Sequence, residues 1–192
     1  MPRKLVYYVA CTIDGFIAHA DGSHGGFLFE GAHFQDLIDE FPETFSAHLR
    51  SALGIPDTVR RFDTVLMGRA TYEVGLREGI TSPYAPLRQF VISRTMEASL
   101  DPGVTLRRDS PVELVKELKA EEGKDIWLCG GSKLASVLAD EIDELILKIN
   151  PILFGEGIPL FDGALGPLRL TLAERKEYPN GFALARYRMP NR

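Results

Sequence analysis

Three short segments of the sequence combine glycine, hydroxyl and guanidinium groups in a way that suits a phosphate. The clearest is Gly130-Gly131-Ser132, which follows the apolar run 126–129 and precedes leucine and valine residues at helical spacing. A strand that ends at two glycines and leads into a helix leaves backbone N–H groups unpaired and uncovered by side chains. Ser132 stands where we expect the N-cap of that helix. A plain tight turn explains the glycines equally well, and no G-x-G-x-x-G fingerprint is present.

Two further strand ends carry an arginine. Gly68-Arg69-Ala70-Thr71 follows the apolar run 62–67, and Ser93-Arg94-Thr95 follows the run 89–92. A guanidinium matches phosphate oxygens in shape and stays charged, although an arginine beside a helix is also a common surface residue. Ligands of open α/β sheets collect at the carboxyl ends of the strands. The three ends together therefore predict one anionic ligand.

Two acidic residues stand beside glycines in loops. Asp14 precedes Gly15 after the first strand, and Glu156 lies between two glycines in the apolar loop 152–161. Either carboxylate suits a contact with a substrate hydroxyl or amine, but an aspartate before glycine is often a turn residue and a glutamate at a loop tip is often only exposed. The glycine-rich loop 21–26 is either a lid over a flat ring or a plain surface loop.

Short apolar runs and amphipathic segments must position these groups. An Asn180-Gly181 pair between two alternating runs predicts a terminal antiparallel hairpin over 169–177 and 182–188. The pattern indicates an α/β fold with a mostly parallel sheet. We expect buried strands over 4–11, 62–67, 89–92, 126–129 and 144–149, and helices over 33–41, 43–53, 110–123 and after Ser132.

Composition and charge exclude several classes. The chain has 192 residues, of which 45% are hydrophobic and 26% charged, so we expect one globular domain over 1–192. A net charge of -5 argues against nucleic acid as a partner. The first apolar run is too short for a signal peptide or membrane span, which favours a cytoplasmic protein without a membrane partner. Cys11 and Cys129 have no metal-ligand spacing, and we expect free thiols and no metal.

Five of these motifs, in this order, resemble the dihydrofolate reductase-like superfamily. Within it, the chain is most similar to the reductase domain of the bifunctional riboflavin-biosynthesis deaminase-reductases, in a stand-alone form, and the likeness covers nearly the whole chain. The resemblance implies a three-layer α/β/α fold, with a mostly parallel central sheet that ends in an antiparallel hairpin and with NADPH across the strand ends. The motifs are Asp14-Gly15-Phe16-Ile17-Ala18, Gly68-Arg69-Ala70-Thr71-Tyr72-Glu73, Ser93-Arg94, Gly130-Gly131-Ser132 and the segment 154–161.

The resemblance also implies roles for individual residues. The Gly-Gly turn matches a pyrophosphate site, the turn around Arg69 a second phosphate site, and Ser93 with Arg94 the adenosine 2′-phosphate site. Two arginines beside that extra phosphate favour NADPH over NADH, because each charge-assisted bond contributes ~1.5 to 3 kcal/mol. The implied cofactor-binding residues are Ala10, Ile17, Ala18, Gly68, Arg69, Thr71, Ser93, Arg94, Cys129, Gly130, Gly131, Ser132 and Leu134.

Two departures from the superfamily pattern leave the substrate open. Dihydrofolate reductases proper carry a Pro-Trp motif after the lid and an acid early in the next helix, whereas the matching region 27–36 has no tryptophan. The zinc motif of the deaminase is absent, so we expect no deamination. The candidate proton donors are Asp14, Glu30, Asp36 or a bound water, and the candidate substrate contacts are Asp14 and Glu156.

The leading hypothesis is an NADPH-dependent reductase that passes hydride to a C=N or C=O group of a small, pterin- or pyrimidine-like substrate. The first alternative is the 5-amino-6-(5-phosphoribosylamino)uracil reductase of riboflavin synthesis, which needs a basic cluster; His24, Arg50 and Arg60 are available but scattered. The second alternative is a non-catalytic nucleotide-binding protein without an acid near the nicotinamide. The resemblance also suggests a homodimer.

Overall fold

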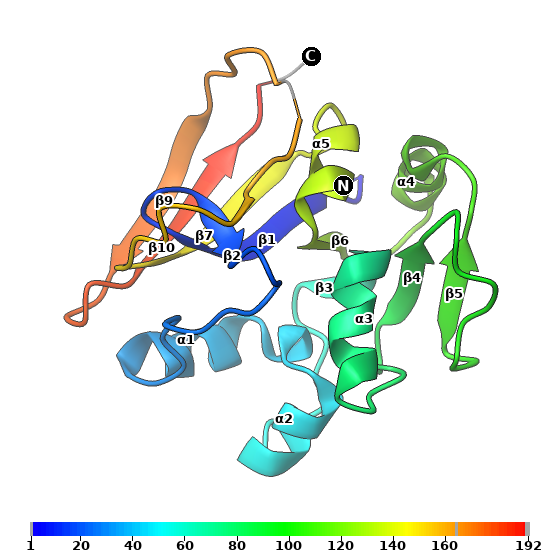
Figure 1. The fold of residues 1–192 in the computed structure, drawn as a ribbon, viewed down its shortest axis with the longest axis horizontal. Helices are drawn as coiled ribbons and strands as arrows, with labels where there is room; N and C mark the ends of the chain where they lie inside the picture. Colours follow the sequence, from blue (N-terminus) through cyan, green and yellow to red (C-terminus); the bar gives the residue numbers. More distant parts are fainter. Residues whose placement is uncertain (1, 164, 191–192) are drawn as a thin grey trace.

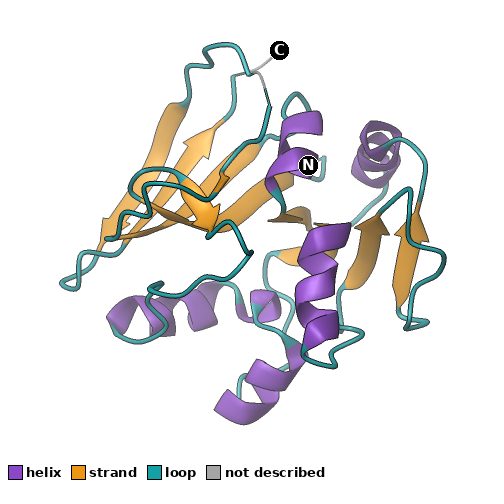
Figure 2. Ribbon diagram, viewed as in Figure 1, coloured by secondary structure: helices purple, strands orange, loops and turns teal. Residues whose placement is uncertain are grey.

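The computed structural model describes residues 2–163 and 165–190, and within them eight strands form one sheet with helices on both faces (Figures 1 and 2). The strand order is β5-β4-β3-β6-β1-β7-β10-β9. The strands from β5 to β7 are parallel, and β10 and β9 close the sheet as an antiparallel hairpin. The bounds are β1 Leu5–Thr12, β3 Phe62–Gly68, β4 Arg88–Ile92, β5 Val104–Arg107, β6 Asp125–Gly130, β7 Glu144–Asn150, β9 Thr171–Glu177 and β10 Ala183–Arg188.

The helices divide between the two faces of the sheet. They are α1 Ala32–Glu40, the short 3-10 helix η1 Pro42–Thr44, α2 Ala47–Leu53, α3 Arg69–Arg77, α4 Pro111–Ala120 and α5 Ser132–Val137. Leu37 of α1 and Tyr72 of α3 join the core cluster around Trp127 on one face. Leu118 of α4 and Leu134 of α5 join the cluster on the other. The expected three-layer α/β/α fold is therefore confirmed.

The middle of the sheet shows why the apolar runs predicted strands. β1 pairs with β6 on one side and β7 on the other, and helices cover both of its faces, so seven of its eight residues are buried. The same argument holds for β3 and β6. β5 was missed because it is a four-residue strand at the edge of the sheet in which only Val104 is buried.

Two local predictions differ from the structure. The helix expected over 43–53 is broken into η1 and α2, because the carboxylate of the buried Glu43 accepts bonds from the backbone N–H groups of Arg61 and Phe62, each at 2.7 Å, and this ties the segment to the start of β3. Ser132 is not an N-cap: α5 begins at Ser132 itself, Gly131 occupies the N-cap position, and no side chain caps the helix.

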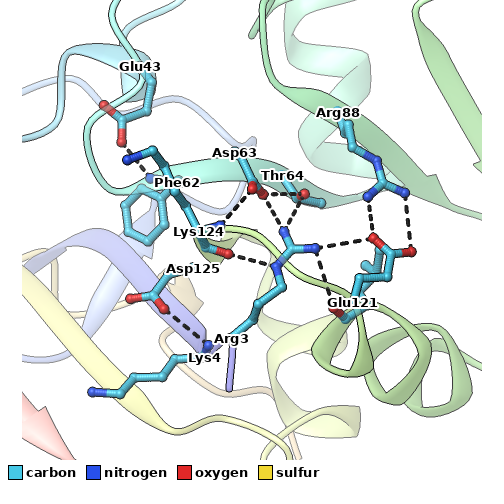
Figure 3. A network of polar contacts seen from close by, with 11 residues as sticks. Arg3, Lys4, Glu43, Phe62, Asp63, Thr64, Arg88, Glu121, Lys124 and Asp125 are labelled. Carbon is cyan, nitrogen blue, oxygen red and sulfur yellow. Dashed lines mark hydrogen bonds and ion pairs between the residues drawn. The ribbon is translucent and has the colours of Figure 1, made fainter. Parts of the chain in front are cut away.

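The amino ends of the strands are held by a dense polar network (Figure 3). Its centre is Arg3, which is 3% exposed. Its guanidinium donates to the carbonyl oxygens of Lys124 at 2.7 Å and Leu118 at 3.3 Å and to the Thr64 hydroxyl at 2.7 Å, and it forms an ion pair with Asp63. The network joins β3, β6 and α4 to the chain just before β1, so these groups have no capacity left for a ligand.

Candidate functional site

Two glycine turns meet at the carboxyl edge of the sheet. A methyl group added at Gly68 would lie 3.9 Å from both the Gly130 oxygen and the Gly131 nitrogen, and one added at Gly131 would lie 3.5 Å from the Thr71 hydroxyl oxygen. Gly130 has φ +143°, a conformation that side chains disfavour. The ends of β3 and β6 thus lie against each other, and the glycines add no side chains of their own beside Thr71, an arrangement that suits close approach of a phosphate.

The remaining residues of the Gly-Gly motif point into the protein. Ser132 is 5% exposed and Leu134 9%, and Leu134 packs in the core cluster beneath α5. α5 is only six residues long, so its dipole adds little to anion binding. The buried Ser132 side chain is therefore a poorer candidate for a contact with an anion than the backbone of the turn.

The two arginines of the strand ends differ in their contacts. Arg69 donates to Thr95 at 2.7 Å and to Glu73, one turn along α3, at 2.6 Å, so it bridges α3 to the loop after β4. The Ser93 hydroxyl accepts from the backbone N–H groups of Thr95 and Met96 and shapes that loop. Arg94 is exposed and has neither a hydrogen bond nor an ion pair to any described residue. Its guanidinium is therefore available to a ligand.

The segment containing Ile17 and Ala18 forms a small antiparallel sheet over this edge. β2 Phe16–Ala18 pairs with β8 Ile158–Pro159. The backbone N–H of Leu160 donates to the Gly15 oxygen at 2.9 Å, and the Tyr7 hydroxyl donates to the Leu160 oxygen at 3.0 Å. A side chain at Gly157 would meet the Ala18 oxygen at 2.4 Å. Close packing of the two strands therefore requires glycine at that position.

The glycine-rich loop expected as a lid is held by aromatic stacking. The Phe154 ring stacks on His19, with ring centroids 3.8 Å apart, and on Phe27 at 5.5 Å. A cavity of about 450 Å³ lies between the loop 21–25 and the α3 residues Val74 and Arg77. The loop therefore covers a hollow against the C-terminal half of α3, and the glycine turns do not line that hollow.

Asp14 lies beside this edge, and its ionised carboxylate joins two loops. Its carboxylate accepts bonds from the Thr12 hydroxyl at 2.5 Å and from the backbone N–H groups of Phe154 and Gly155 at 3.1 and 2.7 Å. These bonds, the one from Thr12 first, lower the pKa of Asp14. A carboxylate held in its charged form is a poor proton donor at neutral pH. Glu156 is exposed at the tip of the adjacent loop and has no partner among the described residues.

The other two candidate proton donors, Glu30 and Asp36, lie at α1. Asp36 forms an ion pair with Lys176 of β9 and accepts a 2.7 Å bond from the Tyr178 hydroxyl, and these contacts, that with Lys176 first, lower its pKa. Asp36 thus ties α1 to the hairpin. Glu30 is exposed just before α1 and lacks a partner in the described part of the chain. Neither Asp14 nor Asp36 has the raised pKa of a protein general acid.

One ionisable residue at this edge was missed by the sequence reasoning. Lys148 of β7 stands beside Ala10 of β1 in the sheet register, and its Nζ lies 4.3 Å from the centroid of the Tyr8 ring. Cys129 of β6 lies on the same face, with its Sγ 3.6 Å from the Tyr84 hydroxyl. The signal in the sequence was a single lysine inside the otherwise apolar run 145–149.

The basic residues considered for a substrate phosphate do not form a cluster. Arg50 is buried beside a cavity of about 540 Å³ at α2, and it donates to the carbonyl oxygen of Phe45 at 2.7 Å and pairs with Asp57 at 3.1 Å. Arg60 precedes β3 at the amino edge, and His24 lies in the lid loop. The three residues therefore belong to three separate regions.

Two further properties concern membranes and metals. Among the helices of residues 2–163 and 165–190, none combines the length and apolar character that crossing a membrane requires. The same residues contain no group of three or more His, Cys, Asp or Glu side chains arranged to hold a metal ion.

Comparisons with known proteins agree with this architecture. A family model described as the RibD C-terminal domain matches residues 3–184. The uncharacterized Bacillus subtilis (strain 168) protein YwjB is 32% identical over 186 residues, covering 96% of this chain and 97% of the relative. The Enterococcus faecalis dihydrofolate reductase complexed with NADP(H) and RAB-propyl has a TM-score of 0.66 at 16% identity, over 98% of this chain and 97% of that one.

A second solved structure resembles this chain over part of its own length. It is the diaminohydroxyphosphoribosylaminopyrimidine deaminase/5-amino-6-(5-phosphoribosylamino)uracil reductase of Thermotoga maritima, with a TM-score of 0.66 at 17% identity. The match covers 98% of this chain but 57% of the Thermotoga protein. At this identity the likeness shows the fold, and the fold is the one expected from the sequence.

Proposed function

Because the chain belongs to the RibD C-terminal domain family, we propose that it is a reductase that uses NADPH to pass hydride to a C=N or C=O group of a small heterocyclic substrate. The observation that carries this proposal is the meeting of two glycine turns at the carboxyl edge, with the unpaired Arg94 beside them. A related fold binds NADP(H) in the Enterococcus enzyme.

Different residues at this edge contact different parts of NADPH in this proposal. The backbone at Gly68, Gly130 and Gly131 offers the pyrophosphate a surface to which the glycines add no side chains, and Arg94 with Arg69 offers charge to the adenosine 2′-phosphate. Ile17 and Ala18 of β2 cover the nicotinamide side and keep water out. NADPH supplies the hydride when bound, and the protein contributes orientation and a proton.

We infer that the substrate is a pterin- or pyrimidine-like ring, because the names of the similar solved structures are those of a dihydrofolate reductase and a uracil reductase. The alternative is the 5-amino-6-(5-phosphoribosylamino)uracil reductase reaction, which the name of the Thermotoga relative supports. The commitment of Arg50 to Phe45 and Asp57 speaks against it, since a ribose phosphate needs free basic groups. The non-catalytic alternative predicts nucleotide binding without turnover.

A cytoplasmic homodimer belongs to the same proposal. One feature supports the dimer: β9 forms an edge of the sheet and all seven of its residues are exposed, so its outer backbone groups are available for pairing. Light scattering during size-exclusion chromatography measures the molar mass and tests this part separately.

Calorimetric titration with NADPH and NADH tests the cofactor site. We expect Arg94→Ala to weaken NADPH binding about ten-fold or more, because a charge-assisted bond contributes ~1.5 to 3 kcal/mol, while NADH binding stays nearly unchanged. Arg175→Ala, at an exposed arginine of β9 on the opposite side of the sheet, is the matched control. Loss of NADPH absorbance with dihydrofolate and the ribosylaminouracil phosphate as acceptors then tests turnover. A folded protein that binds neither nucleotide would contradict the proposed function.

A further inference from the structure

Lys148 occupies an unusual position on the α1 face of the sheet. Most polar side chains at the centre of the sheet lie at strand ends, whereas Lys148 lies inside β7, two residues before the end at Asn150. Its neighbour across the parallel register is Ala10 of β1, and strands in a sheet lie about 5 Å apart. Its amine reaches back over the Tyr8 ring, with Nζ 4.3 Å from the ring centroid. The side chain thus extends from β7 across β1 toward β6.

The Lys148 amine has no hydrogen bond or ion pair with any described residue, and it lies over the face of the Tyr8 ring. The residue is mostly buried but keeps part of its surface exposed, and it lies at the carboxyl edge where we propose that the ligand binds. Structural lysines in this protein behave differently: Lys119 pairs with Asp143 at 2.7 Å and Lys176 pairs with Asp36. An unpaired amine over an aromatic ring at a ligand-binding edge suits a functional role.

The titratable groups that face Lys148 are neutral ones. Tyr8 and Cys11 come from β1 and Cys129 from β6, and Tyr84 binds Cys129 from the loop before β4. Burial raises the pKa of Cys129 to about 11 and that of Cys11 to about 12, so both thiols stay protonated at neutral pH.

Charged groups lie farther off, at the outer end of Tyr8. Glu40 of α1, Glu43 of η1 and Arg186 of β10 act on the Tyr8 hydroxyl, and Glu40 and Arg186 form an ion pair with each other. No carboxylate therefore stabilises the Lys148 ammonium ion directly. Desolvation accordingly lowers the pKa of Lys148 to about 8.

We propose that Lys148 is the catalytic proton donor of the reductase site and acts on the substrate directly. This assignment rests on the proposed function. As hydride adds to the carbon of the substrate C=N or C=O bond, the π pair moves to the nitrogen or oxygen, and that atom takes a proton from the Lys148 ammonium. The nicotinamide is oxidised, the substrate is reduced by two electrons, and the neutral amine regains a proton from solvent.

The geometry favours Lys148 over the carboxylates for this role. Asp14 and Asp36 are each fixed by hydrogen-bond donors that keep them ionised, and Glu30 lies exposed outside the sheet. Lys148 stands beside Ala10, one of the implied cofactor-binding residues, and its amine carries a proton at neutral pH but is able to release it. Its aromatic and thiol surroundings leave no competing base.

Trace acetylation tests the environment of Lys148 without any knowledge of the substrate. The intact protein is labelled with acetic anhydride at pH values from about 6 to 10, a range that brackets the lowered pKa of Lys148. The acetylation of each lysine is quantified by mass spectrometry. We expect labelling of Lys148 to rise as the pH passes about 8, and saturating NADPH to slow it. Exposed Lys116 of α4 is the reference in the same samples. Labelling that is absent, or insensitive to NADPH, would overturn the assignment.

Three variants test proton donation with the best acceptor from the turnover assay. Lys148→Met keeps a long apolar side chain, and we expect kcat to fall about 100-fold or more while the NADPH Kd is unchanged. Lys148→Arg keeps the positive charge but cannot release a proton, so we expect it to stay equally slow. Lys116→Met, at an exposed lysine of α4, is the matched surface control and should match wild type. Restored activity in Lys148→Arg would show that charge alone is needed and would overturn proton donation.

The pH profile gives an independent reading. The ammonium is the active form, so kcat/KM of the wild-type enzyme should fall as the pH rises through about 8, and this alkaline limb should vanish in Lys148→Met. Melting temperatures establish that each variant is folded. If the wild-type protein does not bind NADPH, the proposed function is refuted. If NADPH binds but does not slow the acetylation of Lys148, or if Lys148→Met keeps the fall in kcat/KM at alkaline pH, only the role of Lys148 as proton donor is refuted. Where no acceptor turns over, the labelling result decides.

Discussion

Polar groups are paired at one edge of the parallel sheet and unpaired at the other. At the amino edge, Arg3 and Glu43 are almost fully buried and their polar atoms are bonded to backbone and side-chain partners (Figure 3). At the carboxyl edge, two glycine turns meet, and Arg94, Glu156 and Lys148 have no hydrogen-bond or ion-pair partner among the described residues. Side chains without a protein partner are available to a ligand, whereas the buried groups of the amino edge are committed to their partners.

This difference separates stability from binding. The amino-edge network joins β3, β6 and α4, and its members cannot leave without stranding a buried partner. The carboxyl-edge groups are wholly or partly exposed and support little of the fold. Substitutions of the paired side chains at the amino edge should therefore change the free energy of unfolding, and substitutions of the charged side chains at the carboxyl edge should change the affinity for NADPH.

The largest effect is expected at the centre of the amino edge. Arg3→Leu should lower the free energy of unfolding by about 3–5 kcal/mol, because it leaves Asp63 and Thr64 without their buried partner. Urea denaturation measures the change. Arg88→Ala, which breaks an exposed pair with Glu121, is the control and should cost about 0–1 kcal/mol. Weaker NADPH binding by folded Arg3→Leu would break the separation of the two edges.

A structural glycine at the carboxyl edge should give the next largest effect. Gly157→Ala should cost about 1–3 kcal/mol, because its φ is +151° and the new Cβ would meet the Ala18 oxygen at 2.4 Å. Gly155→Ala, at φ +75° with no atom within 4 Å, should cost less. Urea denaturation gives the energies, and hydrogen exchange locates the loss at β2. Equal costs at both positions would show that strand packing is not the cause.

Arg69→Ala should change the affinity for NADPH while leaving the free energy of unfolding nearly unchanged. We expect the NADPH Kd to rise about ten-fold, from the lower end of the ~1.5 to 3 kcal/mol of a charge-assisted bond. Its surface pair with Glu73 is one turn apart on a helix, so stability should fall by about 0.5 kcal/mol or less. Calorimetry and urea denaturation measure the two quantities on one preparation. A large loss of stability with unchanged affinity would reverse the roles of the edges.

The smallest effect is expected for Asp14, whose carboxylate joins two exposed loops. Its pKa is lowered in the folded protein, so the loop contact is complete above the ordinary aspartate pKa of about 4 and is lost as the pH falls through the lower folded value. NMR titration should show the Phe154 and Gly155 amide signals moving only in that acid range. Asp14→Asn should remove this movement. Amide signals that move near neutral pH would contradict the assignment.

The sequence predicted the strand ends better than the side chains that matter there. Continuous apolar runs identify β1, β3 and β6, because strands covered on both faces have no polar side to alternate with. Helix α2 and strand β5 were misjudged, since the Glu43 tie and the edge position of Val104 depend on distant parts of the chain. Which of several polar groups remains unpaired is a tertiary property. Asp14, Asp36 and Lys148 therefore could not be ranked from sequence.

The Phe154 ring has a kinetic consequence. It stacks on His19 and on Phe27, which flank the glycine-rich loop on both sides, and its own backbone N–H is bound by Asp14. Opening the lid therefore means separating Phe154 from two rings, and the segment 152–157 must move or lose its contacts at the same time. We expect the separation of these rings to set the rate at which ligands enter and leave. Two ligands with equal affinity should therefore exchange at different rates if only one of them requires the loop to open.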